Sequence, residues 1–243
     1  MSYYLTLMTA CDPAPLILAC DTTQGACSVA LYQDKVLAAQ IEEMSRGHAE
    51  ALMPILESLL AEAATDCQAL TRLAVTHGPG TFTGVRVGLA AMRGLALALD
   101  LPLKTYGTLA VMAAAHEFKD DPLLVAVDAK RDTFYAQAFD RQGAAISDPA
   151  ALSAAQLVTL AESLGAARMA VCGTGAPLLA AHWSGFYASQ AAPYPHAVYL
   201  AEMAAQDDDW ADLPPAEPLY LRPPDATLPD PEKRIKWRGA RPA

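Results

Sequence analysis

The stretch His77-Gly78-Pro79-Gly80-Thr81-Phe82-Thr83-Gly84-Val85-Arg86-Val87-Gly88 decides the fold of this chain. It follows a short apolar run, residues 73–76, and leads into an apolar segment rich in small residues that ends near Leu99. An apolar run, glycine and proline, and then a hydroxyl residue before a long apolar segment predict a strand, a turn and a helix. The helix N-cap is expected at Thr81 or Thr83.

The predicted helix is too apolar for a single buried face. Between Thr83 and Leu99 only Arg86 and Arg93 carry charge, so the helix needs two neighbours, one of which can be another protein. A stripe of small residues suits the close approach of a second helix, and the opposite stripe can pack on a sheet. The small stripe consists of Gly84, Gly88 and Ala91, and the opposite one of Val85, Leu89, Met92, Ala96 and Leu99. Packing within the same domain is the commoner use of such a stripe.

Composition and charge restrict the class of protein. The 243 residues are 53% hydrophobic, which is enough for a large core in one domain or two. The formal net charge of -10 disfavours contact with nucleic-acid phosphates unless basic residues cluster. They cluster only in a tail after Glu232, which contains Lys233, Arg234, Lys236, Arg238 and Arg241.

The cysteines and the apolar runs indicate the compartment. Five cysteines without CxxC spacing are typical of buried thiols in a reducing compartment, so we expect the cytoplasm. No apolar run is expected to span a membrane. Residues 1–14 lack a basic n-region, and we interpret them as an ordinary extension.

The chain contains an internal repeat. Pro15 to Tyr32 aligns without a gap to Pro122 to Phe139, so that Asp21 matches Asp128. The pattern predicts an α/β protein made of two duplicated β-β-β-α-β-α lobes. We expect the first lobe over residues 15–106, the second over 107–205, and a proline-rich linker with the basic tail over 206–243.

The polar turn Asp21-Thr22-Thr23 is the first candidate site. In a duplicated two-lobe fold an aspartate at the end of the first strand can hold a magnesium-nucleotide. The turn has one glycine and no lysine at P-loop spacing, so an ordinary hairpin turn explains it equally well. In the second lobe Lys130-Arg131-Asp132 stands where a glycine-rich turn is expected, which weakens the nucleotide hypothesis.

The search for metal-binding and nucleophile motifs predicts neither a metal site nor a catalytic residue. His48 has Leu52 four residues on rather than a second histidine, so a structural role is expected and no metal site is predicted. The sequence contains no Gly-x-Ser-x-Gly and no Ser-x-x-Lys motif, so no catalytic residue is predicted.

Taken together, these stretches resemble the TsaB (YeaZ) family, paralogues of the tRNA threonylcarbamoyltransferase subunit TsaD. The matching stretches are residues 17–23 with 26–31, 46–50 with 52–56, 78–88, 95–97 before Leu101-Pro102, and 218–222. They cover the first lobe nearly end to end and the second lobe loosely. TsaD-like members carry a His-x-x-x-His pair, which Leu52 breaks here.

The resemblance implies the actin-like ATPase-domain fold, of the ASKHA and RNase H-like type, and a non-catalytic role. TsaB would bind TsaD and, with TsaE, support formation of N6-threonylcarbamoyladenosine beside the anticodon of tRNAs reading codons that begin with A. ATP and a metal are then expected on the partner subunits, with no cofactor on this chain. A homodimer of the free protein and a tRNA contact through the basic tail are further expectations.

The sequence predicts a second amphipathic helix in the first lobe, from Leu52 to Ala63. This helix and the one from Thr83 to Leu99 form the first-lobe helix pair, which is the expected partner interface. The residues assigned to it are Leu52, Ile55, Leu56, Leu59, Gly84, Gly88, Ala91, Met92 and Leu95. Two enzyme alternatives stay open at this stage. One is a metal-dependent glycoprotease-like peptidase, and the other is a small-molecule kinase of the actin-like class.

Overall fold

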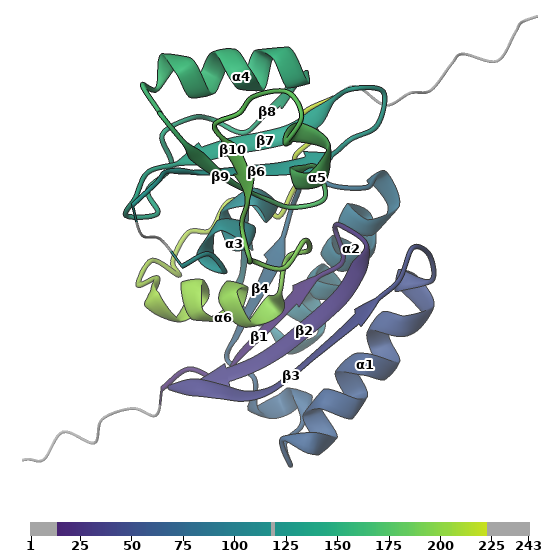
Figure 1. The fold of residues 1–243 in the computed structure, drawn as a ribbon. Coiled ribbons are helices and arrows are strands. Elements are labelled where there is room, and N and C mark those ends of the chain that lie inside the picture. Colours follow the sequence, from purple (N-terminus) through teal and green to yellow (C-terminus); the bar gives the residue numbers. More distant parts are fainter. Residues whose placement is uncertain (1–13, 118–119, 223–243) are drawn as a thin grey trace, which may run out of the picture.

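The computed structural model describes residues 14–117 and 120–222. Residues 1–13, nearly all of the predicted extension, and the basic tail after Glu232 lie outside the described residues, so the expectations about them stay predictions. Two five-stranded sheets form the described part, one after the other along the chain (Figure 1).

The first sheet has the strand order β3-β2-β1-β4-β5. The strands are β1 (Ile17–Asp21), β2 (Ala26–Gln33), β3 (Lys35–Glu43), β4 (Arg72–Thr76) and β5 (Leu103–Tyr106). β1 pairs antiparallel with β2 and parallel with β4. Every residue of β1 is buried, because helices cover both faces of the sheet. That explains why its sequence is continuously apolar rather than alternating.

Helices α1 (His48–Glu62) and α2 (Phe82–Leu99) cover one face of the first sheet (Figure 1). Alternate strand residues such as Leu18 and Val29 pack against them. Leu52, Leu56 and Leu59 of α1 are almost fully buried there, each contributing about 2–3 kcal/mol of hydrophobic stabilisation.

The second sheet has the order β10-β9-β6-β7-β8. Its strands are β6 (Leu123–Asp128), β7 (Phe134–Phe139), β8 (Ala150–Leu152), β9 (Met169–Cys172) and β10 (Phe186–Ala188). Helices α4 (Ala154–Ser163) and α5 (Ala176–Leu179) accompany it, and a short 3-10 turn, Cys67–Ala69, precedes β4 in the first lobe. The two units share the element order β-β-β-α-β-α, followed in each by one more parallel strand. The duplicated α/β architecture is therefore confirmed.

One helix lies where the predicted lobe boundary did not put it. Helix α6 (Ala197–Gln206) was assigned by sequence to the second lobe, but it packs on β1 and β2, on the face of the first sheet opposite α1 and α2. Ser28 of β2 accepts a hydrogen bond from the N–H of Ala197 at 2.9 Å, which fixes the start of the helix. The short helix α3 (Thr108–Ala114) contacts both α6 and β6, so it joins the two lobes.

The expectation about membrane-spanning segments needs a correction. Within the described residues α2 is long and apolar enough, by length and composition alone, to cross a membrane. One such helix is weak evidence for a membrane span, and the five buried residues of α2 pack against the core of the first lobe or against its turn at Thr22.

Candidate functional site

The start of α2 is packed onto the Asp21-Thr22-Thr23 turn. Thr81, one of the two predicted candidates, is the N-cap of α2, and its hydroxyl accepts a hydrogen bond from the N–H of Gly84. The hydroxyl of Thr22 donates to the Gly84 carbonyl at 2.7 Å, and the N–H of Thr81 donates to the Thr23 carbonyl at 2.8 Å. The helix and the turn therefore form one hydrogen-bonded unit.

Glycine makes this close approach between helix and turn sterically possible. A Cβ at Gly84 would lie 2.1 Å from the Thr22 carbonyl oxygen, and one at Gly80 would lie 2.4 Å from the Thr23 carbonyl oxygen. A Cβ at Gly88 would lie 2.7 Å from the Thr22 hydroxyl. The small-residue stripe thus packs against the protein's own turn.

The carboxyl of Asp21 lies beneath this unit and is fully buried. It accepts the N–H of Thr23 at 3.1 Å, the hydroxyl of Thr23 at 2.8 Å, and the hydroxyl of Thr76 on β4. Burial raises the pKa of Asp21 from 3.8 to about 6, against these hydrogen bonds, which lower it. The carboxyl therefore serves as a structural acceptor.

A magnesium-nucleotide does not fit at this turn. Thr22 and Thr23 are each 1% exposed, and Gly80 and Gly84 lie directly against their carbonyl oxygens. Phosphate oxygens would need the space that the start of α2 fills, so we derive no nucleotide chemistry here.

The matching turn of the second lobe is also occupied by the chain's own side chains. Lys130, Arg131 and Asp132 all have left-handed backbone angles, with φ between 52° and 65°. The ammonium of Lys130 lies 2.6 Å from the Asp128 carboxylate and lowers the pKa of Asp128. A basic side chain thus takes the place where a cation would approach the carboxylate.

The structural role expected of His48 is confirmed. Its Nε2 lies 2.9 Å from the carbonyl oxygen of Gln24, and the side chain is buried at the start of α1. Among the residues that the structure describes, no group of three or more histidine, cysteine, aspartate or glutamate side chains could hold a metal.

Most residues assigned to the partner interface lie inside the first lobe. Seven of the nine are buried against the sheet or the turn: Leu52, Ile55, Leu56, Leu59, Gly84, Gly88 and Met92. Ala91 and Leu95 are half-buried and pack against the same core. A partner does not reach the seven, so their assignment is corrected, because helical periodicity marks a stripe without saying what covers it.

The surface of the helix pair consists of other residues. On α2 the exposed positions include Phe82, Arg86, Ala90 and Arg93, and Leu97 is 87% exposed. Sequence analysis missed this face, since alanines and leucines on an apolar helix look alike whichever side the sheet covers. The positions of the two arginines, one turn from Phe82 and one turn from Leu97, were the available signal.

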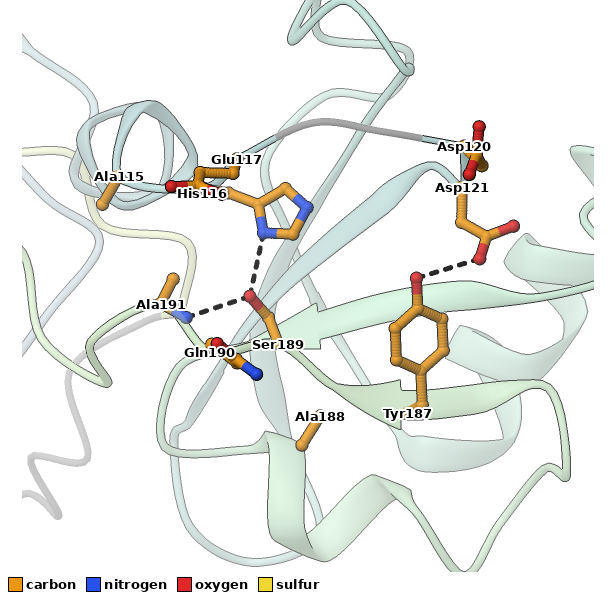
Figure 2. Close-up of a pocket in the computed structure, with 10 residues that line it drawn as sticks. All are labelled: Ala115, His116, Glu117, Asp120, Asp121, Tyr187, Ala188, Ser189, Gln190 and Ala191. Atoms are coloured by element: carbon orange, nitrogen blue, oxygen red, sulfur yellow. Dashed lines mark hydrogen bonds between the residues drawn. The ribbon is translucent and has the colours of Figure 1, made fainter.

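A pocket of about 500 Å³ lies in the second lobe, outside any predicted site (Figure 2). His116 Nδ1 is 2.8 Å from Ser189 Oγ, and Ser189 Oγ also accepts the N–H of Ala191 at 3.1 Å. The hydroxyl of Tyr187 donates to Asp121 at 2.9 Å. No motif links these side chains, because they lie about 70 positions apart in the sequence.

Comparison with solved structures gives the class of fold. The chain covers 98% of (R)-2-hydroxyglutaryl-CoA dehydratase component A from Acidaminococcus fermentans with a TM-score of 0.51 at 9% identity, over 79% of its own length. Together with the duplicated sheets, this likeness places the chain in the actin-like ATPase-domain class of folds.

Sequence comparison gives the family within that class. The family model described as "TsaD: tRNA N6-adenosine threonylcarbamoyltransferase" matches residues 34–192. YeaZ from Pseudomonas aeruginosa covers 85% of this chain and is itself fully covered, with a TM-score of 0.71 at 29% identity. The tRNA threonylcarbamoyladenosine biosynthesis protein TsaB of Escherichia coli is 37% identical over 127 residues, 51% of this chain and 55% of that protein. The chain belongs to the TsaB (YeaZ) family, and its matches span about half the length of the curated TsaB relatives.

Proposed function

We propose that this chain is a non-catalytic subunit in threonylcarbamoyladenosine formation on tRNA and that it acts by binding TsaD. The outer face of α2 carries the proposal, because Leu97 is 87% exposed on it. Exposed large apolar side chains on one helix, here Phe82 at 49% and Leu97 at 87%, mark a surface that a protein partner buries. The name of the Escherichia coli relative supplies the pathway.

The charges of the helix pair favour a partner built in the same way. α1 carries exposed Glu50, Glu57 and Glu62 and no basic side chain except His48, whereas α2 carries Arg86 and Arg93 and no acidic one. The two helices contact each other, so the acidic side chains lie on one helix and the basic ones on its neighbour. A paralogue of the same fold presents an equivalent helix pair, which can place opposite charges across the interface.

The filled turn beneath α2 supports a role without chemistry of its own. With Thr22 and Thr23 packed against the start of α2, we assign ATP and a metal to the partner subunits rather than to this chain. We further propose that TsaE joins the complex, that tRNA contact comes mainly through the other subunits, and that the site of action is the cytoplasm. The modified base would be the adenosine 3′ of the anticodon in tRNAs reading codons that begin with A.

Size-exclusion co-elution with TsaD of the same organism tests the proposal. Leu97→Arg puts a charge in the last turn of the outer face of α2, where an unpaired charge buried by the partner costs several kcal/mol, so co-elution should be lost. Leu178→Arg is the matched control, because Leu178 is 49% exposed on α5 in the second lobe. It should co-elute like the wild type.

Cellular tRNA provides the functional measurement. Cells that carry only Leu97→Arg should lose threonylcarbamoyladenosine from their tRNA, and cells that carry only Leu178→Arg should keep it. Full binding and full modification with a folded Leu97→Arg protein would contradict the proposal.

A further inference from the structure

An arginine packs against a pair of aromatic rings at the exposed start of α2. Phe82 begins the helix, Arg86 follows one turn later, and Tyr220 comes from the C-terminal part of the described chain. The rings are stacked with centroids 5.7 Å apart at 26°. The guanidinium carbon of Arg86 is 3.3 Å from the Phe82 centroid and 5.5 Å from the Tyr220 centroid. We call these three residues the arginine–aromatic cluster.

The position of Tyr220 is fixed by backbone contacts. The N–H of Leu219 donates to the His77 carbonyl at 2.7 Å, and the His77 ring contacts the Glu217 carbonyl at 3.2 Å. Ala216 is buried in the core of the first lobe. The segment 216–222 therefore holds Tyr220 against the start of α2, about 140 positions away in the sequence.

The arginine–aromatic cluster holds a cation whose hydrogen-bonding capacity is not used within the described residues. Across residues 14–117 and 120–222, Arg86 contacts the two rings and makes no hydrogen bond or ion pair. A guanidinium carries five N–H donors in a planar fork that matches a carboxylate. Because the rings already restrict its rotamers, little side-chain entropy remains to be lost on binding.

We propose that Arg86 is the receptor for a carboxylate of the protein that docks on α2. The inference rests on the proposed function and adds the anchor of that interface, with Tyr220 as its positioning residue. Arginine and aromatic side chains are the types that most often dominate protein–protein binding energy.

The surroundings favour a protein carboxylate over an RNA phosphate. The same helix face continues with Ala90 and Leu97, which are exposed and apolar. The neighbouring helix α1 exposes three glutamates, and the chain carries a net charge of -10. The acidic side chains repel either anion, but a protein partner also buries the apolar side chains, whereas a phosphate backbone gains nothing from them.

Isothermal titration of the chain with TsaD of the same organism, at several salt concentrations, tests the inference. Arg86→Ala should weaken binding roughly tenfold to a hundredfold, as expected for the loss of an interface hot spot. Arg86→Lys keeps the charge but loses the fork, so it should weaken binding while the salt dependence stays that of the wild type. Tyr220→Leu should also weaken binding, since it removes one ring and leaves the charge.

Arg141→Ala is the matched control, because Arg141 is exposed between β7 and β8 of the second lobe, outside the proposed interface, and contacts no ring in the described structure. It should change the Kd by no more than about twofold, as is usual for a charge outside an interface. Circular dichroism and thermal melting of each variant check that the exposed substitutions leave the fold intact.

Three outcomes would overturn the inference. Equal losses of affinity for Arg86→Ala and Arg141→Ala would mean that Arg86 acts only through the overall charge of the chain. A loss of affinity for free tRNA with unchanged affinity for TsaD would assign the anion to RNA. If Arg86→Ala binds TsaD with wild-type affinity while Leu97→Arg does not bind, this inference is refuted and the proposed function stands. If both variants bind with wild-type affinity, both are refuted.

Discussion

Replacing the buried Asp21 by asparagine should stabilise the protein at neutral pH and change the pH dependence of folding. The carboxyl is fully buried and has hydroxyl and amide donors but, among residues 14–117 and 120–222, no cationic partner. Its pKa is raised from 3.8 to about 6 by that burial. The difference between the two pKa values corresponds to about 3 kcal/mol.

The sign follows from which state binds the proton. Between pH 4 and 6 the folded chain keeps Asp21 protonated, whereas the unfolded chain releases the proton. The contribution of Asp21 to stability is therefore complete below about pH 4 and is lost as the pH rises through 6. Asparagine keeps the shape and the acceptor oxygen without ionising, so it avoids this loss.

Urea denaturation of the wild type and Asp21→Asn at pH 4, 5, 6 and 7 measures the effect. The difference in unfolding free energy should grow in favour of the variant with rising pH, by up to about 3 kcal/mol, because all other carboxyls titrate alike in both proteins. Thr76→Val removes a hydrogen-bond donor that lowers the pKa of Asp21, so the pKa of Asp21 should rise further in this variant. The loss of stability with rising pH should therefore continue to a higher pH in Thr76→Val than in the wild type. A difference between wild type and Asp21→Asn that stays constant from pH 4 to 7 would refute the reasoning.

Three further predictions concern the packing of the first lobe and the basic tail. Gly84→Ala should destabilise the fold by about 1–3 kcal/mol or more, since its Cβ would lie 2.1 Å from a carbonyl oxygen. A Cβ at Gly94 would meet nothing within 4 Å outside its own helix in the described structure, so Gly94→Ala should instead stabilise α2 by up to about 1 kcal/mol. If the melting temperatures of Gly84→Ala and Gly94→Ala shift in the same direction, the packing described for α2 is contradicted. Leu52→Ala should lower the free energy of unfolding, measured by urea denaturation, by about 2–5 kcal/mol. Met53 is 41% exposed, so Met53→Ala should lower it by less than about 1 kcal/mol, and equal losses would contradict the assigned core. Removing residues 232–243 should lower the tRNA affinity of the assembled complex and flatten its salt dependence, and an unchanged slope would remove the tail from the RNA contact.

Local sequence signals predicted the repeated units well. Asp21 and Asp128 end the first strand of each lobe, and Thr81 caps α2, because strand ends and helix caps depend on neighbouring residues. The alignment at the level of Asp21 and Asp128 also predicted the duplication, since a shared hydrophobic pattern produces the same pairing in both sheets.

Long-range packing could not be predicted in the same way. The placement of α6 on the first sheet depends on the path of the chain between the lobes, and no local pattern encodes that path. The stacking of Tyr220 on Phe82 likewise joins residues far apart in the sequence. Burial of Gly84 and Gly88 was misjudged for the same reason, because a small-residue stripe suits a turn as well as a helix.

The filled turn and the exposed helix face have a single geometric cause. Gly84 and Gly88 let the start of α2 sit directly on Thr22, and this fixes the rotation of the helix about its axis. Because the side of the helix that carries the two glycines faces inward, residues on the opposite side, such as Arg86 and Leu97, must face solvent. Any larger residue at Gly84 would lift or rotate the helix, opening the turn and moving the outer face at once. Binding of TsaD and closure of the turn should therefore be lost together in Gly84 variants, whereas Leu97→Arg should affect binding alone.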